Sequence, residues 1–406
     1  MMRTDRKTRR RLALAAALTA LGGSAAGAQT LEELQARIEA LEARQAEQGR
    51  VIVPAGTTFE FGGYVKLDGI YDFDQGQGDT INTGGLVLGA PDGGGFRAHA
   101  RQTRFWFKTT TETDQGPLKT HFEFDFFGGG GNQILSNSYQ PRLRHAYGTW
   151  NGFLAGQTWT NFMPISFYPD TLDFQGPSGI PFIRQAQLRY TWNPSSRLAI
   201  SASLENSEFS GRNAAGLVGE TSGSGVNANL DGLPDFTLAA EWTGDRAAAR
   251  GAVVLRELNS PGDLDSETGW GVNLAGSADL WPGGKIVGSL TYGDGIGRYI
   301  IDGVGQDAFV DAAGQLHTIT ATGATVQISH ELTPTLTVAL AGGYYNVDET
   351  FAPTDTDQLT TVHASLFWKP NKKVRIGGEL IYGEREFASG ATEDATRLQT
   401  SVQFNF

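Results

Sequence analysis

The chain has 406 residues, contains no cysteine and has a formal net charge of −12 at pH 7. With 54 glycines and 10% aromatic residues, the composition fits neither a helical membrane protein nor an ordinary α/β enzyme. The absence of thiols excludes disulfides and thiolate chemistry, and the acidic balance argues against nucleic acid as a partner.

The first 28 residues have the pattern of an export signal. Three cations, Arg9 to Arg11, precede an apolar run from Leu12 to Leu21, and Ala26-Gly27-Ala28 resembles a cleavage site. The alternative, an amphipathic first helix of a soluble protein, fits poorly because the run is uniformly Ala and Leu. We therefore predict a cleaved signal peptide over residues 1–28 and a location in the Gram-negative outer membrane.

Residues 29–48 show a short heptad pattern. Leu31, Leu34, Ile38 and Leu41 are spaced by three and four residues. About two heptads are not stable as an isolated helix, so this segment is predicted to form a periplasmic coiled-coil helix only in an oligomer. The alternative is a frayed amphipathic leader. Residues 49–56 are predicted to be a linker.

From Thr57 onward the period of hydrophobicity becomes two. Phe61, Val65 and Leu67 share one face, whereas Lys66 and Asp68 share the other. About sixteen such segments follow, with short turns and long loops in alternation. An all-β fold is therefore predicted, a transmembrane antiparallel β-barrel of about sixteen strands over residues 57–406.

The turns and loops divide into two classes. The short connections are centred on residues 114–116, 151–152, 193–194, 244–245, 281–284, 332–334 and 369–372, and are predicted to face the periplasm. The long ones span residues 74–97, 128–140, 159–182, 206–233, 259–267, 300–315, 347–357 and 388–393, and are predicted to face the exterior.

The last segment alternates up to a terminal aromatic residue, Phe406. A terminal strand of this kind resembles the signal that the barrel-assembly machinery reads. Aromatic residues near the strand ends would lie at the two interfaces with outer-membrane lipid and lipopolysaccharide.

Strand parity predicts a cationic inner wall. Guanidinium groups in a narrow passage raise the local anion concentration and bind carboxylates bidentately. The alternative is that each cation is neutralised by a neighbouring acid. The predicted pore-lining cations are Lys66, Arg104, Lys108, Arg142, Arg144, Arg189, Arg197, Arg250, Arg256, Arg375 and Arg397.

The loop over residues 159–182 is too apolar to lie in water. We predict that it folds inside the barrel and narrows it, through Phe162, Phe167, Tyr168, Asp170, Asp173 and Phe174. Burial of an outer loop at a subunit interface is the alternative. The six histidines lack metal-ligand spacing, and no catalytic motif is present, so neither a metal, a cofactor nor an enzyme activity is predicted.

Three stretches resemble one known family. Residues 61–68 (FGGYVKLD), 101–109 (RQTRFWFKT) and 141–148 (PRLRHAYG) are similar to the DcaP-like outer-membrane porins. The resemblance implies a homotrimer of sixteen-stranded barrels that passes small anionic solutes such as dicarboxylates. Three other hypotheses remain open: a general or sugar-type porin, a barrel enzyme and a structural anchor.

Overall fold

The computed structural model describes residues 51–53, 56–91, 93–219, 232–260 and 265–406. The predicted signal peptide and coiled-coil helix lie outside these residues. Within them, none of the helices is both long and apolar enough to cross a membrane.

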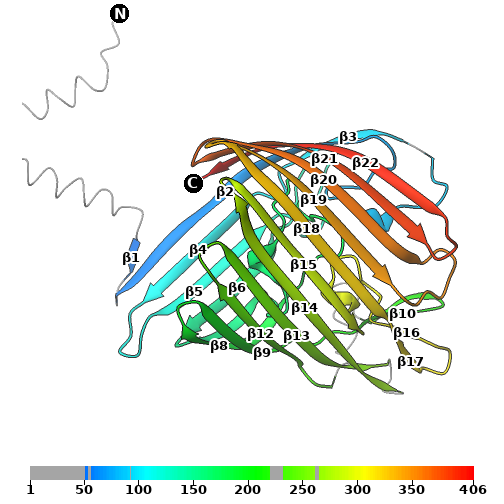
Figure 1. Ribbon diagram of the computed structural model, residues 1–406, viewed down its shortest axis with the longest axis horizontal. Coiled ribbons are helices and arrows are strands. Elements are labelled where there is room, and N and C mark those ends of the chain that lie inside the picture. Colours follow the sequence, from blue (N-terminus) through cyan, green and yellow to red (C-terminus); the bar gives the residue numbers. More distant parts are fainter. Residues whose placement is uncertain (1–50, 54–55, 92, 220–231, 261–264) are drawn as a thin grey trace, which may run out of the picture. The chain divides into compact units, whose positions relative to one another are not determined.

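The described chain forms one closed antiparallel barrel (Figure 1). Each strand pairs with the next along the chain, and the last pairs with the first, so the prediction of sixteen strands is confirmed. In order, the strands are β2 (Thr57–Asp72), β4 (Arg104–Thr111), β5 (Leu118–Asp125), β6 (Arg142–Trp150), β7 (Phe153–Trp159), β8 (Arg184–Ser195), β9 (Leu198–Glu205), β12 (Asp235–Thr243), β13 (Ala247–Asn259), β14 (Ser266–Trp281), β15 (Gly284–Asp294), β18 (Thr320–Thr333), β19 (Leu336–Val347), β20 (Thr356–Asn371), β21 (Val374–Phe387) and β22 (Thr392–Asn405).

The barrel closes along β2. One edge of β2 pairs with β22, from Tyr64 opposite Asn405 to Asp72 opposite Arg397. The other edge pairs first with β4 and then with the short strand β3 (Gly95–His99). Phe406 completes the seam, because its backbone N–H donates to the carbonyl of Gly63 at 3.1 Å. A closed sheet leaves no strand edge unpaired, which is the condition for crossing lipid with strands.

The two faces of the wall differ as strand parity predicts. On β2 the outward side chains of Phe61 and Leu67 are each 55% exposed. Lys66 and Asp68, the two residues on either side of Leu67, are buried. Large apolar side chains, mostly Leu, Val, Phe, Tyr and Trp, are exposed on the other strands as well. An apolar outer face with polar side chains inside is the pattern of a barrel in a membrane.

Four short strands lie outside the barrel sheet. β10 (Ser210–Asn213), β11 (Gly216–Gly219), β16 (Ala308–Val310) and β17 (Leu316–Thr318) form a separate small sheet from two of the long connections. A further short strand, β1 (Val51–Val53), precedes the barrel. Three 3-10 turns, η2 (Thr83–Gly85), η3 (Ile165–Phe167) and η4 (Gly297–Tyr299), lie in the loops.

Candidate functional site

Residues 160–183, between β7 and β8, run across the inside of the barrel. The side-chain amide of Gln327 on β18 is hydrogen-bonded to both backbone groups of Asp170, at 3.0 and 2.8 Å. Thr361 on β20 accepts from the backbone N–H of Ser178 at 2.9 Å. Since β18 and β20 are far from β7 around the barrel, these bonds hold the loop across the lumen.

One carboxylate on the opposite wall anchors the middle of this loop. Glu379 on β21 accepts the backbone N–H groups of Leu172 at 2.7 Å and Asp173 at 3.2 Å. Ser365 and His363 on β20 bond the same carboxylate, at 2.7 and 3.1 Å. All of these residues are buried. Each of the hydrogen bonds therefore replaces one that the Glu379 carboxylate would otherwise accept from water.

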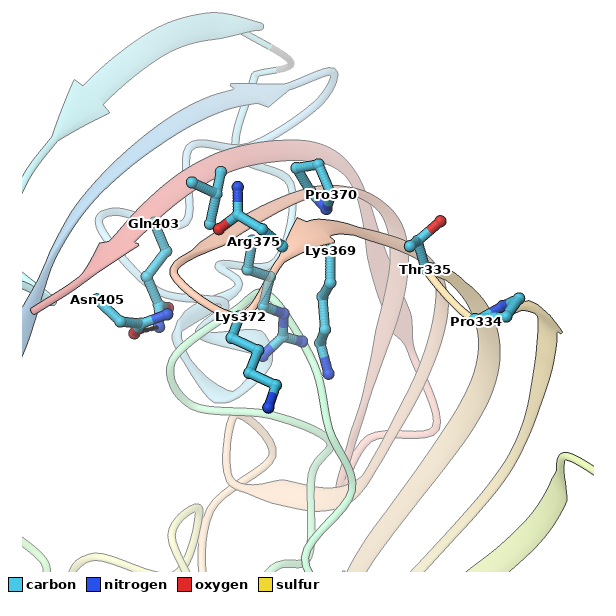
Figure 2. Close-up of a pocket in the computed structure, with 10 residues that line it drawn as sticks. Pro334, Thr335, Lys369, Pro370, Lys372, Arg375, Gln403 and Asn405 are labelled. Atoms are coloured by element: carbon cyan, nitrogen blue, oxygen red, sulfur yellow. Dashed lines mark hydrogen bonds between the residues drawn. The ribbon is translucent and has the colours of Figure 1, made fainter. Parts of the chain in front are cut away.

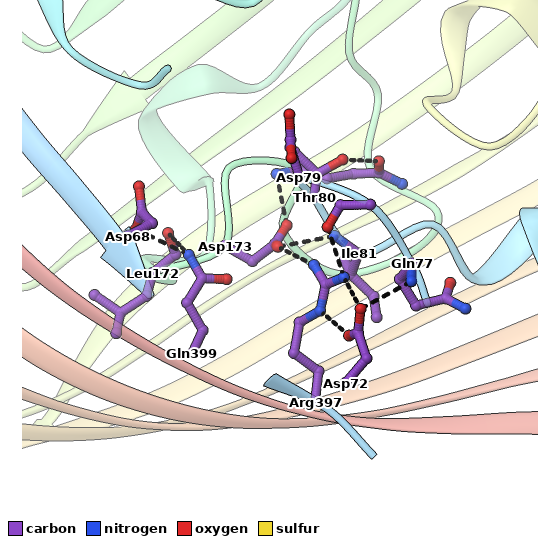
Figure 3. A network of polar contacts seen from close by, with 12 residues as sticks. Asp68, Asp72, Gln77, Asp79, Thr80, Ile81, Leu172, Asp173, Arg397 and Gln399 are labelled. Carbon is purple, nitrogen blue, oxygen red and sulfur yellow. Dashed lines mark hydrogen bonds and ion pairs between the residues drawn. The ribbon is translucent and has the colours of Figure 1, made fainter. Parts of the chain in front are cut away.

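A second anchor is an ionic network around Arg397 (Figure 3). The Arg397 guanidinium binds Asp72 at 2.6 and 3.0 Å and lies 3.5 Å from Asp173. Asp173 in turn accepts the backbone N–H of Ile81 at 2.8 Å. Arg397, which strand parity predicted among the pore-lining cations, is therefore fully buried and neutralised.

A second loop, the one that follows β2, also contacts this network through Gly78 and Ile81. The loop that follows β2 buries Ile81 and Leu86 completely, and Arg385 on β21 donates to the carbonyl of Leu86 at 2.7 Å. Part of this long connection, which was predicted to face the exterior, is therefore packed against the barrel wall instead of lying in solvent. Its apolar side chains pack against the inner wall because burial there removes them from water.

Of the predicted aromatic residues of the inner loop, Phe162 and Phe167 are buried and Tyr168 and Phe174 are half-buried, each against specific partners. Phe162 packs edge-on against Tyr299, with ring centroids 5.6 Å apart, and Phe167 is 1% exposed. Phe174 stacks on Phe127 at 4.5 Å. Tyr168 donates from its hydroxyl to the carbonyl of Gln175 at 3.0 Å. This apolar packing makes the loop a compact body.

A cavity of about 300 Å³, the constriction cavity, lies between this loop and the wall. Arg104 and Arg144 line it from the wall and Asp170 from the loop. The Arg144 guanidinium binds Glu123 at 2.7 Å, whereas that of Arg104 is 3.4 Å from Glu123 and leaves its buried Nε without a hydrogen-bond partner. Further lining residues include Tyr64, Gln102, Trp159, Phe174, Phe182, Arg375 and Gln403.

Arg184, at the start of β8, does not itself line the cavity but lies against two residues that do, Trp159 and Phe182, and strand parity did not select it. Its guanidinium stacks over Trp159 at 4.8 Å and over Phe182 at 5.7 Å. It interacts electrostatically with Arg144, Arg142 and Arg104, and with one carboxylate, that of Asp125. In the part of the chain that the structure describes it has no ion pair, and its buried Nη1 has no hydrogen-bond partner.

Two acidic residues neutralise part of the cluster. Asp125 accepts a bidentate pair from Arg142, at 2.8 and 3.0 Å, and a third bond from Arg144 at 2.9 Å. With Glu123, this gives two carboxylates against the four guanidinium groups of Arg104, Arg142, Arg144 and Arg184. The cluster therefore has a net positive charge.

The remaining predicted cations are distributed unevenly. Lys66 is paired with Asp68 at 3.0 Å and donates to the carbonyl of Leu172 at 2.8 Å. Arg256 is buried by Asp235 and Asp307 under the loops. These two side chains face inward but are covered, which parity alone does not reveal.

Four further predicted cations differ in their accessibility. Arg250 lies 3.3 Å from Glu241 and donates to the carbonyl of Asn161. Arg189 donates to the carbonyl of Trp159 at 2.6 Å. Lys108 lies over the Trp106 ring at 4.5 Å. Arg197 was predicted on the wall but lies in the turn after β8, exposed and paired with Asp245 at 2.9 Å.

The tip of the inner loop contains a pH-sensitive contact. Asp302 accepts the backbone N–H of Gly179 at 2.9 Å and the side-chain amide of Gln175 at 3.3 Å. Gly179 has a φ of +81°, and a Cβ there would lie 1.9 Å from the carbonyl oxygen of Tyr344. Loss of hydration in this position raises the pKa of Asp302 to about 6.

Because the docked state binds this proton more tightly, we expect docking of the tip to weaken as the pH rises from about 4 to about 6. Above that range it should stay constant. The check is amide hydrogen exchange over residues 176–183 at pH 4.5 and 7, corrected for intrinsic rates. Asp302→Asn should remove the difference, and an unchanged difference in that variant would contradict the assignment.

The described residues contain no cluster of three or more His, Cys, Asp or Glu side chains suited to a metal ion. Two histidines, His121 and His145, stack at 5.7 Å beside Glu123, but these three side chains do not form a group that could hold a metal ion. Their nearest polar partners are the hydroxyls of Tyr147 and Thr158.

Comparison with known proteins gives the family. The model of the DcaP outer membrane protein family matches residues 28–406. The chain belongs to this family. A crystal structure of the DcaP outer membrane channel of Acinetobacter baumannii superposes with a TM-score of 0.77 at 21% identity, covering 88% of this chain and 99% of that one. No curated protein matches the sequence.

Other porins share the fold of this DcaP-family chain. An anion-selective porin from Comamonas acidovorans gives a TM-score of 0.58 at 12% identity, with coverage of 86% and 100%. OmpT of Vibrio cholerae gives 0.55 at 12%, with coverage of 88% and 100%. The chain is therefore an outer-membrane protein with the fold of these porins. The structural neighbours named here are channels and porins.

Proposed function

We propose that this chain is a diffusion porin with a preference for small anions, dicarboxylates among them. The observation that supports this most directly is Arg184, whose guanidinium interacts with those of Arg144 and Arg104 and forms no ion pair of its own in the described chain. An unpaired guanidinium in a narrow, partly apolar passage attracts carboxylates and can bind them bidentately. The inner loop would then be the constriction of the pore.

A second candidate is a general or sugar-type porin without charge preference. It is favoured by the pairing of most inner-wall cations, for example Arg142 with Asp125 and Arg250 with Glu241. A wall of neutralised pairs would set up only a transverse field. The two functions differ in the sign and size of the ion selectivity.

Assembly and export complete the proposal. The chain would be exported with a signal peptide over residues 1–28 and inserted by the barrel-assembly machinery into lipid and lipopolysaccharide. It would function as a homotrimer, as the trimeric form of OmpT of Vibrio cholerae illustrates for this fold. The same fold forms an anion-selective porin in Comamonas acidovorans, so anion preference is compatible with it.

The test is a bilayer recording of the refolded full-length protein under a KCl gradient, followed by addition of succinate. We expect a reversal potential on the chloride side and a reduction of current by succinate at millimolar concentration. Glucose at the same osmolarity is the control and should leave the current unchanged. Cation selectivity, or no effect of succinate, would favour the general porin instead.

A further inference from the structure

A second group of cations lies at the end of the barrel that has the short turns. A pocket of about 560 Å³, the turn pocket, is formed around the turn between β20 and β21. Its polar lining comprises Lys369, Lys372, Arg375, Gln403, Asn405 and Thr335. Figure 2 shows the long side chains of Lys369, Lys372 and Arg375 extending in the same direction from this turn.

The lining of the turn pocket is unbalanced in charge. It contains three cations and no Asp or Glu side chain. In the described part of the chain, neither Lys369 nor Lys372 has an ion pair. Each exposed ammonium group would attract an anion weakly on its own, but the fields of the two lysines add at one pocket, beside Arg375, which is paired with Asp170 of the inner loop. The pocket therefore has the chemistry of an anion site.

Arg375 connects this pocket with the constriction cavity. Both Arg375 and Gln403 line the two cavities, and they are direct neighbours across β21 and β22. Arg375 binds Asp170 of the inner loop at 2.7 Å and stacks over Phe367 at 4.1 Å. Its Nε is buried without a hydrogen-bond partner. Cations thus follow one side of the wall from Arg104 to the turn.

We propose that the turn pocket is a second anion-binding site, at the periplasmic mouth of the channel, for one carboxylate of a small dicarboxylate. The proposal rests on the proposed function, because it concerns the solute that has passed the inner loop. Lysine ammonium groups are mobile point charges and hold a carboxylate less rigidly than a guanidinium does. Such a site would receive the leading carboxylate and release it readily to the periplasm.

The test compares two charge-removing variants in the full-length protein. K369Q/K372Q removes both lysines of the pocket, and K373Q removes the exposed lysine next to them, which does not line it. Succinate is added to each chamber of a planar bilayer in turn. Loss of a charge-assisted contact corresponds to about tenfold weaker binding or more. K369Q/K372Q should therefore show about tenfold weaker succinate block from one chamber, with the other changed less than about twofold.

A single cysteine identifies the chamber. The chain contains no cysteine, so K372C would have one thiol. An anionic thiosulfonate reagent should react with it faster from the chamber whose block K369Q/K372Q weakens. Normal heat-modifiable migration on gels would show that each variant has folded.

Two outcomes would overturn the inference, and they are distinguishable. If wild-type protein is blocked by succinate but K369Q/K372Q behaves like K373Q, the turn pocket binds no anion and the proposed function stands. If wild-type protein is not blocked at all, the proposed function fails and the inference fails with it.

Discussion

Glu379→Gln is expected to release the inner loop and raise the single-channel conductance. The glutamine keeps the size of the side chain but removes the charge that accepts the backbone N–H groups of Leu172 and Asp173. Loss of hydrogen bonds to a buried charge costs about 2 kcal/mol or more, which raises the undocked fraction of the loop about thirtyfold. Recordings should show larger and noisier current steps, and the loop should become sensitive to protease.

The control lies on the same strand. Glu384 is bonded to the hydroxyl of Tyr382 in an exposed position, away from the loop. Glu384→Gln removes the same charge and should leave conductance and proteolysis unchanged. A Glu379→Gln channel with wild-type conductance would show that Arg397 and the apolar packing of Phe162 and Leu172 hold the loop without this anchor.

Arg184→Gln should abolish most of the anion preference. This guanidinium forms no ion pair in the described chain and its buried Nη1 has no hydrogen-bond partner, so a solute carboxylate that reaches it would supply the missing acceptor. A charge-assisted hydrogen bond contributes about 1.5 to 3 kcal/mol, which corresponds to about tenfold to a hundredfold weaker block by succinate. The reversal potential in a KCl gradient should shift towards the potassium side.

Two further variants separate charge from geometry. Arg184→Lys keeps the charge but loses the planar fork, so it should preserve the reversal potential and weaken succinate block. Arg246→Gln removes a cation from an exposed turn, where the side chain only donates to the carbonyl of Asp279, and should change neither. If Arg184→Gln and Arg246→Gln had equal effects, the ion selectivity would depend on the net charge of the protein and not on the position of Arg184.

The period of two in the sequence was enough to predict the barrel and the direction of its side chains. Phe61 and Leu67 face outward and Lys66 inward because strand geometry leaves only these alternatives. Parity could not show what covers an inward side chain. Arg397 and Arg256 point inward, yet loops far away in the sequence bury and neutralise them.

Arg184 was missed for a related reason. It is the first residue of β8 and lies an odd number of residues before Arg189, so strict alternation assigns these two arginines to opposite faces of the strand. Its environment of Trp159, Phe182 and neighbouring arginines arises only when the loop folds back. The apolar composition of residues 159–182 predicted that the loop folds inward, but it did not indicate that Arg184 would lie against the folded loop.

The seam along β2 has a consequence for how the protein is made. Tyr64 pairs with Asn405, so the first and last strands of the barrel meet only after the whole chain has been synthesised. Bringing such distant segments together costs chain entropy before any stabilising contact forms, and folding rates fall with this separation. Until Phe406 meets Gly63, Phe61 and Phe105, every intermediate exposes two unpaired strand edges in or beside a membrane. The closure of the seam between β2 and β22 is therefore expected to be slow without assistance. Catalysed assembly would act mainly on the rate of this step and not on the stability of the finished barrel.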